Sequence, residues 1–125
     1  MAVQRRDFTP QEIERVWQFA IPVEGFSPDQ IRRDYAGAFI MKEYYGDRTS
    51  RFGWEIDHII PLEKDGSNEL WNYAPLQWEN NMQKSDNFPY WQTKVAFNDA
   101  SNYESYKDWF GVVSGESVAI IPVKK

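Results

Sequence analysis

Apolar residues near the start of the chain recur at intervals of three and four positions, which is typical of one face of an α-helix. They are Ile13, Val16, Trp17 and Ala20. Thr9 and Glu12 have the spacing of a capping box, and Pro10 suits the first helical position. The pattern therefore predicts a helix with Thr9 as its N-cap.

A similar arrangement of Ser27, Pro28 and Gln30 predicts a second short helix, which Gly37 ends or bends. Residues 38–46, AFIMKEYYG, fit either a helix or a strand. Their aromatic residues and isoleucine favour a strand that is closed by the final glycine.

Apolar runs in the middle of the chain are short and bounded by polar residues. Residues 54–60, WEIDHII, predict a strand that Pro61 closes, and residues 71–76, WNYAPL, predict a short returning strand. The EKDGSNEL segment between them is a loop. Residues 77–87, QWENNMQKSDN, predict a helix of about three turns, ended by the turn-forming residues at its C-terminus.

The pattern is less clear towards the C-terminus. Residues 90–99 predict a strand, residues 102–111 a short helix, and residues 117–123 a strand with Pro122 at a sheet edge. The chain contains no internal repeat or low-complexity linker. One α+β domain over residues 1–125 is the simplest organisation.

The composition limits the metal sites that the chain can form. Cysteine is absent, so disulfides and any cysteine-based structural zinc are excluded. His58 is the one histidine, which excludes a zinc site built from several imidazoles. A bound metal must use oxygen ligands, which favours Mg²⁺, Mn²⁺ or Ca²⁺. Aromatic residues make up 17% of the chain, and core filling explains this surplus more readily than stacking on bases.

Charge argues against a broad phosphate-binding surface, because the formal net charge is −5. Basic residues nevertheless cluster as Arg5-Arg6, Arg32-Arg33, and Arg48 with Arg51. A solvated surface is the simpler interpretation of these clusters, and a track for phosphates is the alternative. The N-terminus lacks the apolar segment of a signal peptide, and no run is long enough to cross a bilayer. We therefore expect a cytoplasmic protein without membrane contact.

Groups suited to metal-assisted hydrolysis lie close together in the middle of the chain. Asp57 and His58 are neighbours on a predicted strand, and Asn80 and Asn81 lie on the predicted helix. Packing that helix on the strands would bring Asp57 close to an asparagine, and two oxygen donors with water form a partial shell for Mg²⁺. An adjacent imidazole is suited to deprotonating water. These groups together favour hydrolysis of a phosphodiester.

The spacing of these residues resembles the motif of HNH endonucleases. His58 precedes Asn72 by 14 positions, and Asn72 precedes Asn81 by 9. This arrangement is similar to the histidine–asparagine–asparagine variant in the HNH domain of RNA-guided DNA-cutting effectors. The stretch YYGDRTSRFGWEIDHIIPL also looks like a group of small stand-alone HNH proteins. The resemblance covers roughly residues 32–87.

For the fold, the resemblance implies a ββα-metal core, or His-Me finger, at about residues 36–87. N-terminal helices at residues 9–35 would precede it, and a β-rich extension at residues 88–125 would follow it. The chain departs from the family's pattern at Asp65, where glycine is usual, and at Tyr73, where leucine is common. Neither departure removes a group with a chemical role.

The resemblance also implies a role for each matching residue. Asp57 would bind one divalent metal ion, preferably Mg²⁺, and Asn81 would supply the second ligand. His58 would be the general base that activates water. Asn72 would hydrogen-bond the loop backbone and hold the two strands in register. The implied activity is cleavage of DNA that leaves a 5′-phosphate and a 3′-hydroxyl.

Other polar residues near the motif have weaker assignments. Glu55 is a candidate auxiliary ligand, although an exposed strand carboxylate is the simpler interpretation. Asn80 competes with its neighbour for the role of ligand. Lys84 would contact phosphate or lie solvated at the end of the helix. Arg48 and Arg51 are candidates for contacts with the DNA backbone.

Neighbouring side chains on a regular strand point to opposite faces, yet Asp57 and His58 must serve one site. We therefore expect a strand end or a bulge at this pair.

Two alternatives to an independent nuclease remain. The first is a non-catalytic ββα module that acts through a protein partner, which the acidic C-terminal half and the β-rich tail favour. The second is a nuclease half that needs a basic partner to deliver its substrate.

Overall fold

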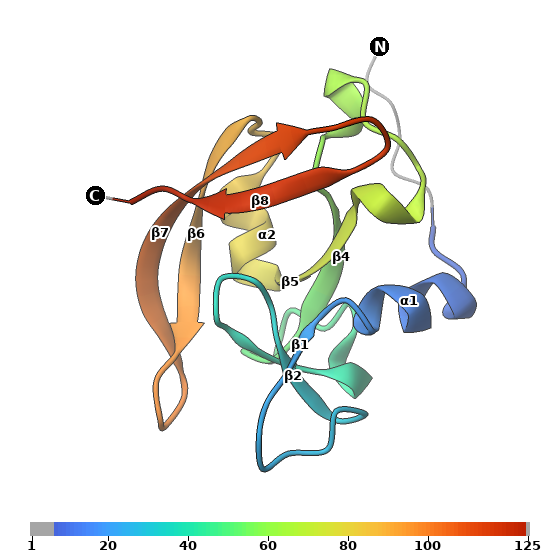
Figure 1. Cartoon of the computed structure of the whole chain (residues 1–125). Coiled ribbons are helices and arrows are strands. Elements are labelled where there is room, and N and C mark those ends of the chain that lie inside the picture. The colour runs from blue at the N-terminus through green and yellow to red at the C-terminus, as the bar shows by residue number, and fades with distance from the viewer. Residues whose placement is uncertain (1–6, 125) are drawn as a thin grey trace.

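Three small antiparallel sheets and two α-helices make up the fold of residues 7–124, the part of the chain that the computed structural model describes (Figure 1). The helices are α1 (Pro10–Trp17) and α2 (Trp78–Lys84). The strands are β1 (Ile21–Pro22), β2 (Ile31–Arg33), β3 (Phe39–Met41), β4 (Trp54–His58), β5 (Tyr73–Gln77), β6 (Tyr90–Phe97), β7 (Asn102–Val113) and β8 (Val118–Pro122). Short 3₁₀ helices occupy Lys42–Tyr44, Leu62–Lys64 and Leu70–Asn72. The sheets are β1–β2–β3, β4–β5 and β6–β7–β8, so the fold mixes α and β structure.

Helix α1 begins as the sequence predicts. The Thr9 hydroxyl accepts a hydrogen bond from the Glu12 amide at 3.1 Å, and the Glu12 carboxylate accepts one from the Thr9 amide at 3.0 Å. This pair completes the capping box. The buried ring of Trp17 lies 5.3 Å from the ring of Trp54, so α1 packs directly against β4.

The helix predicted after Ser27 is wrong, and α1 is the one α-helix within residues 7–35. Residues 27–30 form a turn, in which the Ser27 carbonyl accepts hydrogen bonds from the amides of Gln30 and Ile31. The chain then continues as β2, which pairs with β1 and β3. The predicted strand at residues 38–46 is present only at Phe39–Met41, after which the chain turns into a 3₁₀ helix.

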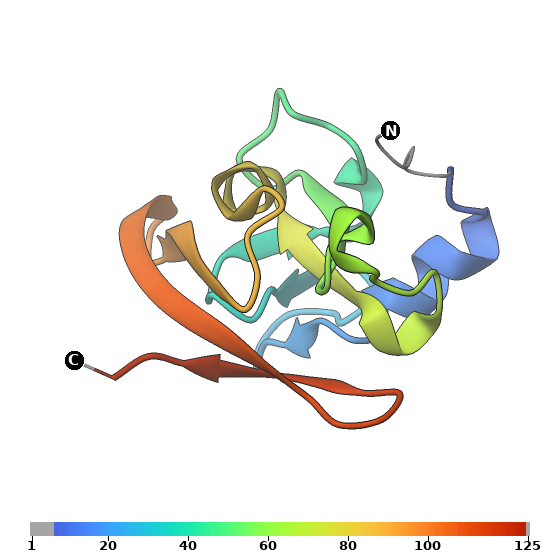
Figure 2. The same cartoon turned by 90° about the horizontal axis from the view of Figure 1, so that it is seen from above.

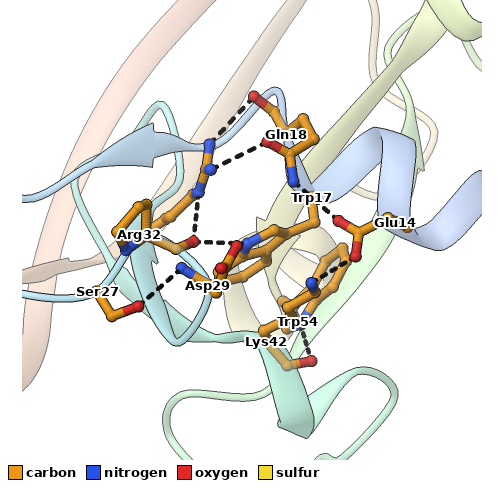
Figure 3. A network of polar contacts seen from close by, with 9 residues as sticks. Glu14, Trp17, Gln18, Ser27, Asp29, Arg32, Lys42 and Trp54 are labelled. Atoms are coloured by element: carbon orange, nitrogen blue, oxygen red, sulfur yellow. Dashed lines mark hydrogen bonds and ion pairs between the residues drawn. The ribbon is translucent and has the colours of Figure 1, made fainter.

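Arg32 explains why this segment is extended. Its guanidinium donates hydrogen bonds to the carbonyl oxygens of Gln18, Ala20 and Pro28, and it lies 5.8 Å from the centre of the Trp17 ring. Figure 3 shows Arg32 joined to the end of α1 in this way. These tertiary bonds override a weak local helical signal. Arg32 is buried, so it belongs to neither a solvated surface nor a phosphate track.

The short helix predicted at residues 102–111 is also wrong, because this segment lies within β7. The first part of β7 pairs with β6, and the last part pairs with β8. Strand pairing therefore satisfies the backbone groups that a helix would have satisfied internally. Among the described residues β8 has β7 as its one partner strand, so the edge position predicted for Pro122 is confirmed.

Strands β4 and β5 form the centre of the molecule, with Asp57 opposite Ala74 and His58 opposite Tyr73. Helix α2 follows β5 directly and lies between this pair and the β6–β7 ribbon (Figures 1 and 2). It has 7 residues and is shorter than predicted, because the chain leaves it at Ser85 with a φ of 53°.

Two clusters of buried apolar residues hold these elements together. The first joins α1 to β3, β4 and β5, and consists of Val16, Trp17, Ala20, Ile40, Trp54, Ile56 and Tyr73. The second consists of Ala36, Ile59, Ala74, Trp91 and Trp109, so it joins β5 to the C-terminal sheet. Core filling therefore accounts for part of the aromatic surplus, whereas Phe19, Phe26, Tyr90, Tyr103 and Tyr106 are exposed. No helix within residues 7–124 combines the length and the apolar character needed to cross a bilayer.

Asp34 is a fully buried carboxylate that accepts four hydrogen bonds. Its Oδ1 accepts from the amides of Ala36 and Ala38 at 3.0 and 2.9 Å. Its Oδ2 accepts from the Gln77 amide and from Asn80 Nδ2, both at 3.0 Å. One side chain thus connects the turn before β3 to β5 and to α2.

Asn80 extends this connection to β6. Its Oδ1 accepts from the amides of Lys94 and Val95 at 2.7 Å, and its Nδ2 also donates to the Val95 carbonyl at 2.9 Å. The pairing of β6 with β7 is irregular between Thr93 and Val95, so Asn80 supplies the partners that the neighbouring strand does not. Asn80 is therefore a structural residue of the core.

Replacing Asn80 by alanine should lower the free energy of unfolding by about 4 kcal/mol, because four hydrogen bonds are lost, three of them buried and the one from Lys94 part-buried. Asn81→Ala is the matched control, since it removes one hydrogen bond to Glu55 and should cost about 1 kcal/mol. Urea denaturation measures both values. Equal losses would contradict the role of Asn80.

Stability should also depend on the protonation of Asp34. Burial raises the pKa of Asp34 to about 6 from 3.8, against the opposing effect of its four hydrogen bonds. Between these values the folded protein binds a proton that the unfolded chain has lost. The resulting stabilisation is complete below pH 3.8 and is lost as the pH rises through about 6, a change of about 3 kcal/mol.

Urea denaturation at a series of pH values measures this change. The difference in unfolding free energy between wild type and Asp34→Asn should shrink as the pH rises from about 4 to about 6, because an amide does not titrate. A constant difference would rule out a raised pKa of Asp34 in the folded state.

Candidate active site

Strand β4 presents its side chains in two rows. Trp54 and Ile56 belong to the cluster with α1, whereas Glu55 and Asp57 face α2. His58 is the last residue of β4, so the expected strand end is present. Side chains that leave the strand in opposite directions can line one pocket at such an end.

A pocket of about 460 Å³ lies where β4 ends, beside α2 and the 3₁₀ helix Leu62–Lys64. Asp57, His58 and Asn81 all line it. Its other polar lining residues are Arg48, Glu63, Ser85 and Asp86. Three of the residues that the sequence assigned to a site are therefore brought together.

Asn68, Tyr73 and Phe8 are described residues that contact the imidazole of His58. Its Nε2 lies 2.8 Å from Asn68 Oδ1, and an amide oxygen can only accept, so Nε2 carries the proton. In the neutral ring Nδ1 then carries the lone pair that a base requires. The Tyr73 ring meets the imidazole edge-on at 5.1 Å, and the Phe8 ring lies 6.0 Å away. The Tyr73 hydroxyl also donates to the Asn68 carbonyl at 2.7 Å, which steadies the loop beside His58.

The sequence pattern did not mark Asn68 or Tyr73 as site residues. Asn68 is one of several asparagines in a polar loop, and no spacing rule distinguishes it from the others. Tyr73 is visible in the sequence only as a departure from the leucine that is common at this position of the HNH pattern. Both contacts depend on the folding of the loop back towards His58.

The Asn72 side chain binds the backbone of the loop between β4 and β5. It is fully buried, and its Oδ1 accepts from the Ile60 amide at 2.8 Å. Its Nδ2 donates to the carbonyl oxygens of Ile60 and Ser67, both at 2.9 Å. These hydrogen bonds to the loop backbone are the ones expected for Asn72.

Asn81 reaches the pocket, whereas Asn80 points into the core. The Asn81 Nδ2 donates to Glu55 Oε1 at 2.9 Å, so Oδ1 is the Asn81 atom that could bind a metal. Glu55 also accepts from Nε and Nη2 of Arg48 at 2.8 and 2.9 Å, and this pairing raises the pKa of Arg48. The Glu55 side chain is 17% exposed, so the interpretation of an exposed carboxylate is wrong. Glu55 orients the Asn81 amide.

Lys84 lies behind the pocket with no exposed surface. Its Nζ is 3.2 Å from Asp57 Oδ2, and it donates to the His58 carbonyl oxygen at 3.2 Å. The Nζ also lies 5.2 Å from the centre of the Trp91 ring. Neither a solvated lysine nor one that touches phosphate fits this burial. Lys84 compensates the charge of Asp57.

The basic residues proposed for DNA contacts are not equivalent. Arg48 lies at the pocket, and half of its side chain is exposed. Arg51 lies elsewhere, where its Nη1 donates to the Asn102 carbonyl of β7 at 2.8 Å. Arg5 and Arg6 lie outside the described residues.

The oxygen donors of Asp57 and Asn81 fit a hard divalent cation such as Mg²⁺. This ion needs one or two protein ligands and completes its shell with water and phosphate oxygens. Within residues 7–124 no group of three or more histidine, aspartate or glutamate side chains is arranged to hold a metal. The candidate ligand set is therefore one carboxylate and one amide, in a pocket with room for several water molecules.

Comparisons of the chain with models of protein families, with curated proteins and with solved structures find no match. A functional proposal depends on the geometry of the pocket and on the motif.

Replacing Asn68 by alanine should free the His58 ring to adopt both neutral tautomers. The Asn68 oxygen favours the proton on Nε2 in wild type, and the variant loses this preference. ¹⁵N NMR at a pH where the ring is neutral reads the tautomer without overlap, because His58 is the one histidine. Asn87→Ala, at an exposed loop asparagine, is the control. A persistent Nε2–H tautomer in Asn68→Ala would contradict the role of Asn68.

Proposed function

We propose that the chain is a metal-dependent endonuclease of the HNH type that hydrolyses phosphodiester bonds in DNA. One observation carries this proposal: Asp57, His58 and Asn81, which match the motif in spacing, line the same pocket. The antiparallel pair β4–β5 followed by α2 is the order of elements that a ββα-metal core requires. The backbone hydrogen bonds of Asn72 support the same proposal.

In this proposal Asp57 and Asn81 would hold the divalent ion, which would supply Lewis-acid stabilisation of charge on the phosphate and on the leaving oxygen. His58 accepts a proton from the attacking water at Nδ1. Asn68 keeps the ring in the tautomer that permits this transfer. Arg48, at the pocket and half exposed, is placed to contact a backbone phosphate.

Incubation of supercoiled plasmid with the protein and Mg²⁺ or Mn²⁺ should produce nicked or linear DNA, and EDTA should stop the reaction. His58→Ala should lower the rate at least about 100-fold, because the general base is removed. Asn81→Ala should lower it in Mg²⁺, whereas the exposed Asn87→Ala should cleave like wild type. If wild type and His58→Ala leave the plasmid equally intact with every metal, the enzymatic proposal fails.

A second candidate is a non-catalytic ββα module that acts through a protein partner. The observation in its favour is a group of apolar side chains exposed on the C-terminal sheet, among them Tyr90, Val112 and Val113. A negative cleavage assay together with self-association in solution would favour this candidate over the nuclease.

A further inference from the structure

The proposed function gives no role to the positive charge of Lys84. Its Nζ lies 3.2 Å from the candidate ligand Asp57 and has no exposed surface. A side chain buried to this extent cannot touch DNA. Its positive charge therefore acts on the site from behind the pocket, where the Nζ contacts Asp57 and the His58 carbonyl oxygen.

The second carboxylate beside the candidate ligands is also paired with a cation. Glu55, which orients Asn81, is held by two hydrogen bonds from the Arg48 guanidinium. Among the described residues, each of the two carboxylates at the candidate ligands, Asp57 and Glu55, thus has a positive side chain beside it. Glu63 and Asp86, the other acidic residues that line the pocket, are both exposed, and their charges are screened by solvent.

A divalent cation bound to Asp57 would lie close to the ammonium group of Lys84 in a region of low dielectric constant. Like charges repel strongly there, and this repulsion offsets the attraction of the carboxylate. A phosphodiester changes the balance, because it brings a negative charge and oxygen ligands to the same cation.

We propose that Lys84 weakens divalent metal binding at Asp57 and Asn81 in the free protein, so that the metal binds tightly only together with a phosphodiester. This inference rests on the proposed function. In it Lys84 is a positioning residue that controls when the divalent metal binds. Metal binding and DNA binding are then coupled, and by linkage each strengthens the other by the same factor.

Mn²⁺ binding to the full chain, followed by electron paramagnetic resonance, tests the coupling. The titration is made with and without a short DNA duplex, in a His58→Ala background that keeps the DNA intact, and the Mn²⁺ bound by the duplex alone is subtracted. We expect the duplex to raise the Mn²⁺ affinity of the protein at least about tenfold.

Three substitutions at Lys84 separate its charge from its packing. Lys84→Met removes the charge and retains an apolar chain beside Trp91, and Lys84→Gln also retains a donor for the His58 carbonyl. Both should raise the Mn²⁺ affinity of the DNA-free protein by about tenfold or more and reduce the gain that DNA produces. Lys84→Arg retains the charge and should behave like the parent protein. Circular dichroism identifies the variants that fold.

Each outcome bears on a specific claim. If DNA produces no gain in Mn²⁺ affinity, or if a folded neutral variant binds Mn²⁺ no more tightly than the parent, the role of Lys84 is overturned while the nuclease proposal stands. If Mn²⁺ fails to bind with and without DNA, or binds equally well to Asn81→Ala, the metal site itself is wrong and the proposed function falls with it.

Discussion

The arrangement of this chain depends on the buried carboxylate of Asp34. All four of its hydrogen bonds come from protein donors, which lie in the turn before β3, at the end of β5 and on α2. A buried carboxylate without these donors would cost several kcal/mol, so the segments that supply them must come together. Asn80 carries the same network to the backbone of β6. Helix α2 is thereby held between the turn before β3 and strand β6, two segments that are far apart in the sequence.

The position of α2 explains how the candidate site forms. Adjacent helical residues point about 100° apart, so Asn81 faces away from the core because Asn80 faces into it. Residues three apart share a face, and Asn81 and Lys84 therefore both face β4. Asn81 meets Glu55, and Lys84 meets Asp57. The packing of α2 thus also sets where the side chains that could bind metal lie. The C-terminal sheet contributes Trp91, whose ring lies behind Lys84.

Much of the site could be predicted from the sequence, because its parts are close together along the chain. Asp57, His58, Asn72 and Asn81 lie within 25 residues, and their spacing is what resembles the HNH motif. That resemblance implied that Asn72 would bind the loop backbone and that Asn81 would share a site with Asp57. Asn68 could not be predicted, since its contact with His58 depends on the path of the loop. The burial of Lys84 could not be predicted either, because it requires Trp91 from a strand outside the motif.

By itself, the sequence determined the features that follow from local rules. These are the capping box of α1, a strand in the WEIDHII segment, the edge strand β8, and the exclusion of zinc sites that need cysteine or several histidines. Only the tertiary structure decided that residues 31–33 and 102–113 are strands. The local helical signals there are weak, and partners distant in the sequence outweigh them: the carbonyl groups that bind Arg32 in the first case, and the strands on both sides of β7 in the second.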